Sequence, residues 1–378
     1  MSDNIIVVGG GIVGLSTCFE FQEAGFQVTL IDPDPISGAT HHAGGMLAPA
    51  SEIQYQQQAL FPLMKKSAEL YPDLLQRLSR YTELPTGYRT EGTLLLGADR
   101  ADGLHLQDLM AYIRQEDLGV EPLTTRQARS LEPALTPQIS RALLLEGDHQ
   151  VAPRLYARAL YDAIMRRGAH HIVDSVASFD GHSPCTRISL SSGEEVSSTS
   201  VVVLSAGLGV ASIAGWCDGP NPLQLRPVYG DIIRVRVPER LQPLLTHVVR
   251  GFVEDRPIYI IPRSDGTLAI GATSREDSLN PRAGSAHDLL RDAIRLVPGI
   301  EETEFLEITC GARPGTPDDL PYLGWVGSNV IVSTGYFRHG ILLSALAAQS
   351  TVALTTDKPL PVNMQECAPF RHLSLTSN

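Results

Sequence analysis

The first fourteen residues place the strongest constraint on what this chain can fold into. Residues 5–8 are four consecutive β-branched residues, a pattern typical of a buried strand. Gly9, Gly11 and Gly14 follow with the spacing Gly-x-Gly-x-x-Gly, where that strand would turn into a helix. The three glycines would serve a tight turn, the approach of a pyrophosphate to the backbone, and close packing of helix on strand. Glycine-rich turns without a ligand share this spacing, so the residues that follow decide its meaning.

The next residues supply the other parts of a dinucleotide-binding unit. Residues 15–24 predict a helix that ends at Gly25, and residues 28–31 predict a second strand. Asp32 directly follows that strand, where a carboxylate can accept the hydroxyl groups of an adenosine ribose. We therefore predict a dinucleotide site, with the helix N-terminus directed at the phosphates.

Residues 37–49 favour FAD over NAD. They are mostly small residues, whereas a nicotinamide dehydrogenase would continue into another strand-helix unit at this point. A backbone with few large side chains can run along a pyrophosphate and under an isoalloxazine ring. A flexible surface loop is the alternative interpretation.

Composition excludes several other classes of function. The net charge of −12 argues against nucleic acid as a partner and against an anionic membrane surface. The longest apolar region, residues 201–216, is interrupted by glycines, so we expect no membrane insertion. Five scattered cysteines without a Cys-x-x-Cys pair predict reduced thiols in the cytoplasm and no metal site. Nor does the N-terminus show the basic segment of a signal peptide.

The order of elements predicts an α/β protein: a Rossmann-like FAD-binding domain with an interleaved α+β substrate domain built on a large antiparallel sheet. We assign residues 1–85, 146–222 and 312–378 to the FAD-binding domain, and residues 86–145 and 223–311 to the substrate domain. The strand predicted at residues 201–207 ends in small residues, and Gly207 there could close over the cofactor. Alternation from residue 230 onward and a turn at residues 264–266 predict antiparallel strands, including a hairpin of residues 256–263 with 267–273. Helices are expected at residues 59–81, 104–118, 125–131, 155–167 and 286–297, and further strands at residues 93–96, 143–145 and 170–179.

Two late segments carry the remaining chemistry. Arg313 lies at the end of an extended stretch beside a Pro-Gly turn, and its planar guanidinium could bind a substrate carboxylate with two hydrogen bonds. A surface salt bridge is the other interpretation. Residues 335–343 open an apolar helix that runs to about residue 353. The partial positive charge of its N-terminus would stabilise negative charge on a reduced flavin.

These motifs together resemble the D-amino-acid oxidase superfamily of flavoproteins, and within it the glycine oxidases of thiamine thiazole synthesis. The resemblance rests on the N-terminal glycine motif with Asp32, on Ala-Gly-Gly-Met-Leu at residues 43–47, on Gly-Ala-Arg-Pro-Gly-Thr-Pro-Asp at residues 311–318, and on residues 335–343. It covers nearly the whole chain in the same order.

The resemblance implies roles for particular residues. Arg313 would bind the substrate carboxylate, Tyr259 would donate a hydrogen bond to the same group, and Arg338 would lie beside flavin and substrate. The residues implied to contact FAD before the last helix are Ile12, Val13, Asp32, Pro33, Ala39, Thr40, Gly44, Gly45, Met46 and Val176. Those implied to cover the flavin ring are Tyr336, Phe337, Arg338, His339, Gly340, Ile341 and Leu342. Cys310 is one residue out of step with the cysteine that binds FAD covalently in sarcosine oxidases, so we expect non-covalent FAD.

The activity implied is FAD-dependent oxidative deamination of glycine or another small amino acid or amine. A hydride would pass from the α-carbon to flavin N5, water would hydrolyse the imine, and dioxygen would be reduced to hydrogen peroxide. We also expect a homo-oligomer. Two alternatives remain open: a D-amino-acid dehydrogenase that passes electrons to a quinone or another acceptor, and a flavin-bearing partner protein with no turnover.

Overall fold

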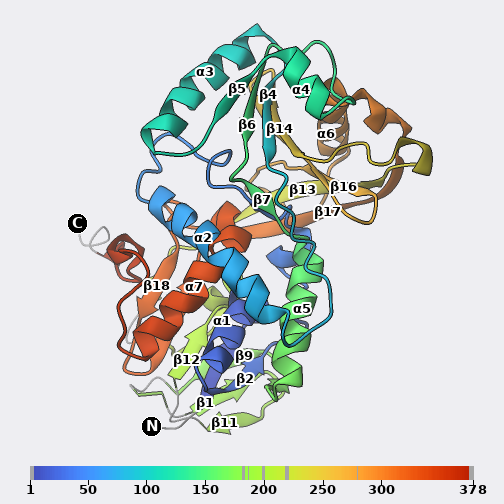
Figure 1. The fold of residues 1–378 in the computed structure, drawn as a ribbon. Helices are drawn as coiled ribbons and strands as arrows, with labels where there is room; N and C mark the ends of the chain where they lie inside the picture. The colour runs from blue at the N-terminus through green and yellow to red at the C-terminus, as the bar shows by residue number, and fades with distance from the viewer. Residues whose placement is uncertain are drawn as a thin grey trace.

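The structure is a computed structural model that describes residues 4–180, 184–185, 187–197, 201–217, 221–278 and 280–373. Two large sheets dominate it (Figure 1). The first has the order β18-β19-β12-β1-β2-β8, and its strands are parallel except for the edge pair β18–β19. The strands of this six-stranded sheet are β1 (Asn4–Val8), β2 (Gln27–Ile31), β8 (His170–Ile172), β12 (Val201–Leu204), β18 (Tyr322–Trp325) and β19 (Val330–Thr334).

The second sheet has eight strands in the order β17-β13-β16-β15-β14-β4-β6-β5, all antiparallel to their neighbours except the parallel pair β14–β4. Its strands are β4 (Thr93–Gly97), β5 (Glu121–Leu123), β6 (Arg141–Leu145), β13 (Arg226–Arg236), β14 (Val248–Val253), β15 (Arg256–Pro262), β16 (Thr267–Gly271) and β17 (Glu304–Gly315). A three-stranded sheet of β9 (Val176–Phe179), β10 (Arg187–Leu190) and β11 (Glu195–Ser197) and the short pair β3 (Met46–Leu47) and β7 (His149–Gln150) complete the strands described. The predicted Rossmann-like arrangement with a large antiparallel sheet is confirmed. The residue ranges assigned to two domains stay a prediction.

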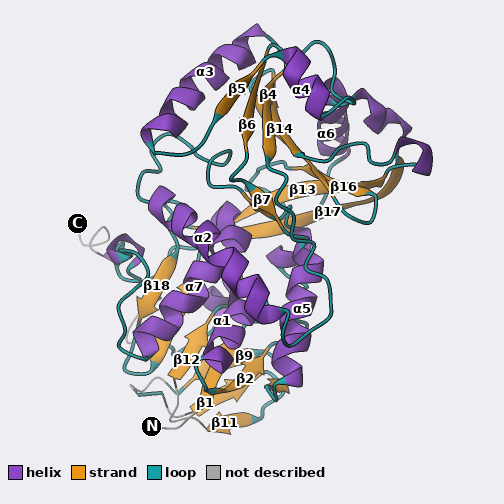
Figure 2. Cartoon of the chain, in the orientation of Figure 1, coloured by secondary structure: helices purple, strands orange, loops and turns teal. Residues whose placement is uncertain are grey.

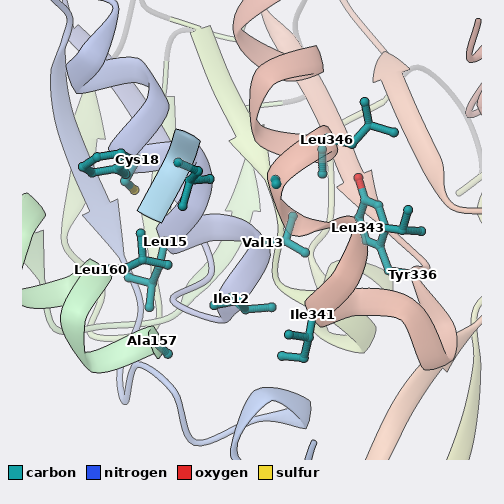
Figure 3. Close-up of a cluster of buried hydrophobic side chains, with 14 of the residues drawn as sticks. Ile12, Val13, Leu15, Cys18, Ala157, Leu160, Tyr336, Ile341, Leu343 and Leu346 are labelled. Atoms are coloured by element: carbon teal, nitrogen blue, oxygen red, sulfur yellow. The ribbon is translucent and has the colours of Figure 1, made fainter. Parts of the chain in front are cut away.

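Helices cover both sheets (Figure 2). Four of them, α1 (Ile12–Glu23), α2 (Phe61–Leu78), α5 (Pro153–Arg166) and α7 (Gly340–Thr355), lie with the six-stranded sheet, and α3 (Arg100–Gln115), α4 (Thr125–Leu131) and α6 (Ala283–Leu296) lie with the other. Helices α1 and α7 consist mainly of apolar and small residues without a distinct polar face, and both are almost wholly buried, because they pack on each other and are covered by α2 and α5. Figure 3 shows the resulting core, where Val13 of α1 lies toward Ile341 and Leu343 of α7 and Leu15 of α1 lies beside Leu160 of α5.

The structure differs from the predicted elements most clearly at the start of the first helix, in residues 170–179 and at the start of the last helix, and the strand predicted at residues 201–207 ends at Leu204. Helix α1 begins at Ile12, directly after the N-cap Gly11, so its first turn lies inside the glycine motif. The strand expected at residues 170–179 is two strands, because β8 joins the six-stranded sheet and β9 the three-stranded one. The last helix begins at Gly340, after a 3₁₀ turn, η5 (Phe337–His339). Among the described residues, no helix has the length and apolar character needed to cross a membrane.

Candidate active site

A cavity of about 640 Å³ lies where the two large sheets meet. One side is formed beyond the carboxyl ends of β1 and β12 and along the end of β19, together with the loop of residues 32–46 and the start of α7. The other side is formed by β13, β14, β15 and β17 of the eight-stranded sheet. Ligands of doubly wound sheets bind beyond the carboxyl ends of the parallel strands, and this cavity occupies that position.

The three motif glycines have distinct environments. Gly9 has a φ of +108°, and a Cβ on it would lie 2.7 Å from the backbone of Ala206. A Cβ on Gly14 would lie 1.9 Å from the carbonyl oxygen of Gly9, so α1 can pack on β1 only without a side chain there. Gly11 is different, because a Cβ there would meet only Thr40 Oγ1, at 3.5 Å. Gly9 therefore allows the tight turn, Gly14 allows the close packing of helix on strand, and Gly11 leaves the backbone open to a ligand.

Two polar side chains fix the loop that follows β2 against this turn. Asp32 accepts hydrogen bonds from the backbone N–H groups of Gly10 (2.6 Å) and Asp34 (2.8 Å), which hold its carboxylate at the cavity wall. Thr40, on a 3₁₀ turn η1 (Ala39–His42), accepts a hydrogen bond from the Ile12 N–H at 2.9 Å. A side chain from a distant loop therefore caps the first turn of α1.

Arginine side chains hold the small-residue loop at the cavity. The carbonyl of His41 accepts hydrogen bonds from Arg154 Nε (2.9 Å) and Arg234 Nη2 (3.2 Å). Arg263 donates to the carbonyl of Gly44. The loop is thus fixed to α5 and to the eight-stranded sheet, contrary to the alternative of a flexible surface loop.

Arg313 and Tyr259 lie on the cavity side of the eight-stranded sheet, each over a glycine of a neighbouring strand. A Cβ on Gly230 would lie 2.3 Å from both terminal nitrogens of Arg313, and a Cβ on Gly271 would lie 2.5 Å from the Tyr259 hydroxyl. Arg313 Nη1 donates to the carbonyl of Thr273 at 3.2 Å. The two glycines leave room for both side chains to lie across the sheet at the cavity.

The cavity favours an anion. Within the described residues, neither Arg313 nor Arg338 forms an ion pair with a carboxylate, and Arg338 Nε is buried without a hydrogen-bond partner. Burial lowers the pKa of both guanidinium groups, because the charged form loses water there. A buried guanidinium without a carboxylate partner is stabilised when a ligand carboxylate binds beside it and supplies the opposite charge.

The two histidines that line the cavity are neutral near pH 7. Burial, together with the charges of Arg338 and Arg250, lowers the pKa of His339 to about 3. Burial and neighbouring cations lower the pKa of His42 to about 4. His339 Nε2 has no hydrogen-bond partner in the described part of the chain. Neither ring is a cation that would compete with the arginines.

The structure brings most of the predicted site residues to one cavity. Those that line it are Gly9, Gly11, Ile12, Val13, Asp32, Pro33, Ala39, Thr40, Gly44, Gly45, Met46, Gly207, Tyr259, Arg313, Tyr336, Phe337, Arg338, His339, Gly340 and Ile341. Gly14 lies behind Gly9, and Val176 and Leu342 belong to buried apolar clusters behind the lining. The role of each residue stays a prediction.

Sequence reasoning missed an ion pair in the cavity wall. Glu52 and Arg250 both line the cavity and pair with each other, and Arg250 stands opposite Tyr259 in the β14–β15 register. Arg250 is only 8% exposed. A charged residue inside the otherwise apolar strand of residues 248–253 could have indicated it, whereas nothing in the sequence around Glu52 does.

Comparison with known proteins gives the family. The sequence matches the family described as FAD dependent oxidoreductase (DAO) over residues 4–354. The chain belongs to this family of FAD-dependent oxidoreductases. It is 30% identical to the glycine oxidase of Geobacillus kaustophilus over 98% of this chain and 97% of that protein. The crystal structure of glycine oxidase from that organism superposes with a TM-score of 0.86, covering 97% of this chain and 98% of the other.

A second group of relatives is longer than this chain. It is 32% identical to the bifunctional protein ThiO/ThiG of Trichormus variabilis over 92% of its length, but that match spans only 52% of the relative. The chain thus spans about half the length of the bifunctional relatives it matches.

The cavity of this FAD-dependent oxidoreductase fits its cofactor. Asp32 stands at one end for a ribose, and the open backbone at Gly11 and the first turn of α1 stand where a pyrophosphate would lie. The start of α7 lies at the same cavity, and His339 at its N-cap makes no capping hydrogen bond from its side chain. Ser67 of α2 positions this turn by donating to the carbonyl of Leu342 at 2.6 Å. In the described part of the chain, no three His, Cys, Asp or Glu side chains gather as a metal site would require.

Proposed function

We propose that this protein oxidises glycine or another small amino acid or amine, with FAD as the electron acceptor and dioxygen as the final oxidant. The observation that carries the proposal is Arg313, a cavity arginine without a carboxylate partner among the described residues, which lines the same cavity as the Tyr259 hydroxyl. The similarity to glycine oxidase supports the choice of an amino acid.

The residues of the chain would bind and orient the substrate. Arg313 would hold the carboxylate with two parallel hydrogen bonds, and Tyr259 would donate its hydroxyl proton to the same group. Burial raises the pKa of Tyr259, so its hydroxyl stays protonated as a donor. Arg338 would lie beside the bound amino acid and add positive charge.

FAD supplies the two-electron acceptor when it is bound. With the carboxylate fixed, these residues would hold the α-carbon toward the cofactor, whose two-electron chemistry would accept a hydride from the C–H bond, and the lone pair of the neutral amine would assist. Water then converts the imine to an oxoacid and ammonia, and dioxygen takes up two electrons and two protons to give hydrogen peroxide. The cavity histidines, with lowered pKa values, are not required as bases for the C–H bond. The rate enhancement would come from orientation and electrostatics.

The biological setting is part of the same proposal. The similarity to proteins named ThiO/ThiG supports a role in thiamine thiazole synthesis. We keep non-covalent FAD, a cytoplasmic location and a homo-oligomer as expectations.

A substrate screen under air tests the function. Purified protein with bound FAD is supplied with glycine, sarcosine, D-alanine and D-proline, and peroxide release is measured without an added acceptor. We expect peroxide, with glycine among the best substrates. Flavin reduction without peroxide would instead assign the protein to the amino-acid dehydrogenases.

A further inference from the structure

The segment after β16 contains a β-bulge at the cavity. Gly271 pairs with Ile232, and the next bridge joins Arg275 to Tyr229. Three residues, 272–274, therefore face two residues of β13, and the extra residue disrupts the regular ladder. All three bulge residues line the cavity. This bulge contacts Arg313 directly, because its Thr273 carbonyl accepts a hydrogen bond from Arg313 Nη1.

A buried ion pair holds the bulge against β13. Asp231 is completely buried, and its two carboxylate oxygens accept from Arg275 Nη1 (2.6 Å) and Nη2 (3.1 Å). The Thr273 hydroxyl lies between them, accepting from the Asp231 N–H at 2.8 Å and from Arg275 Nη1 at 3.2 Å. Arg275 also donates to the carbonyl of Asn280 (2.6 Å) and to Cys310 Sγ (3.3 Å).

Arg313 depends on this arrangement for its orientation. Within the described residues, the Thr273 carbonyl is the acceptor for its guanidinium, which otherwise rests on the bare backbone of Gly230. Gly230 directly precedes Asp231 on β13. The Asp231–Arg275 ion pair therefore lies beside both groups that contact the Arg313 guanidinium, the Thr273 carbonyl and the Gly230 backbone. An arginine side chain has several rotatable bonds, and a preorganised binding site requires that its orientation be restricted before the ligand arrives.

We propose that Asp231 and Arg275 are positioning residues for substrate binding, because their buried ion pair fixes the bulge whose Thr273 carbonyl aims Arg313 at the substrate carboxylate. Neither Asp231 nor Arg275 lines the cavity, so both act through Arg313. The inference rests on the carboxylate-binding role proposed above for Arg313.

The test uses the FAD-loaded protein and the variants Asp231→Asn, Arg275→Lys and the double variant Asp231→Asn/Arg275→Met. Steady-state kinetics with glycine are combined with titration of acetate, an unreactive carboxylate, followed by flavin absorbance. We expect the KM for glycine and the Kd for acetate to rise together by about ten-fold or more, since small displacements of a binding group are costly. The kcat should change much less than KM. Arg275→Lys keeps the positive charge, so its KM for glycine and its Kd for acetate should lie between those of wild type and those of Asp231→Asn.

The double variant tests whether the Asp231–Arg275 pair positions Arg313 or only neutralises its own two charges. It leaves no unpaired buried charge, so a pair that served only to neutralise itself would return KM to the wild-type value. The proposal predicts that KM stays raised. This variant also gives a result if Asp231→Asn alone fails to fold.

A second ion pair, between the buried Asp292 and the partly exposed Arg256, provides the control. Asp292 is 4% exposed and accepts from Arg256 Nε (2.9 Å) and Nη2 (3.1 Å), and neither residue lines the cavity. Asp292→Asn should lower Tm and leave KM and the acetate Kd unchanged. Unchanged KM and Kd in Asp231→Asn, or equal changes in both Asn variants, would overturn the proposal.

Arg313→Met distinguishes failure of the positioning role of Asp231 and Arg275 from failure of the proposed function. If it raises KM and Asp231→Asn does not, the positioning role is wrong and the proposed function stands. If Arg313→Met leaves KM and the acetate Kd unchanged, the proposed function fails and the positioning role fails with it.

Discussion

Single residues give the cavity its preference for a carboxylate. Arg313 and Arg338 are cations without carboxylate partners in the described chain, and the histidines beside them stay neutral. Gly230 and Gly271 matter as much as the charged residues, because any side chain on them would displace Arg313 or Tyr259. The sequence pattern around Arg313 left a surface salt bridge open, and the fold resolves this point in favour of a cavity position.

Removal of the Arg313 charge should abolish most substrate binding. Loss of one partner of a buried, hydrogen-bonded charge pair costs about 2–5 kcal/mol, so kcat/KM for glycine should fall at least about 30-fold in Arg313→Met. FAD content, read from the visible spectrum after gel filtration, should be unchanged. Arg256→Met, outside the cavity, is the control and should keep wild-type kcat/KM. Normal turnover by Arg313→Met would contradict the assignment.

A single methyl group at Gly230 should have a related effect. Its Cβ would lie 2.3 Å from the Arg313 nitrogens, so the guanidinium must move. We expect Gly230→Ala to raise the KM for glycine by about ten-fold or more while FAD remains bound. Gly119→Ala is the matched control, since a Cβ there meets nothing within 4 Å. Equal KM values in the two variants would show that Arg313 does not need this support.

At the level of elements, two helix N-termini face one cavity, and remote side chains hold them there. Thr40 reaches the first turn of α1 and Ser67 the first turn of α7. The sequence predicted both helices, because the glycine motif and the apolar run are local patterns. It could not give the start of α1 at Ile12 or the division of residues 170–179 into β8 and β9, because the first depends on a cap from residue 40 and the second on which sheet each strand joins.

The Thr40 cap should contribute to FAD binding. Thr40→Val removes the acceptor for the Ile12 N–H, and losing a helix cap costs about 1 kcal/mol, so the Kd for FAD should rise about five-fold. Titration of the apoprotein with FAD, followed by flavin fluorescence, measures this change. Thr17→Val is the control, because Thr17 bonds to the Val13 carbonyl within α1 and does not line the cavity. An unchanged Kd in Thr40→Val would contradict the role of the cap.

Across the whole molecule, the site exists only because distant segments assemble two sheets around it. The eight-stranded sheet joins β4 and β14 as a parallel pair and places β17 beside β13, with long stretches of chain between the partners. Local alternation predicted the hairpin of β15 and β16, which the structure confirms. It could not reveal Glu52 with Arg250 or Asp231 with Arg275, because those pairs depend on long-range packing.

Burial of His339 should make the folded protein sensitive to acid. Its pKa falls from the usual 6.5 to about 3 on folding, so the unfolded chain binds more protons between these values. The free energy of unfolding therefore decreases as pH falls from about 6.5 toward 3, and His339→Asn removes this contribution. The Tm of His339→Asn relative to wild type should rise as the buffer is changed from pH 7 to pH 4. A constant difference in Tm across this range would show that His339 is not held neutral.

Anaerobic mixing of the FAD-loaded protein with glycine, while flavin absorbance is recorded, tests directly whether the protein oxidises an amino acid. We expect the absorbance of the oxidised flavin to be lost and ammonia and the oxoacid to appear in equal amounts. The same mixing with Arg313→Met should need far more glycine. Flavin that stays oxidised with saturating glycine, sarcosine, D-alanine and D-proline would rule out the proposed amino-acid oxidation and favour a flavin-bearing protein without turnover.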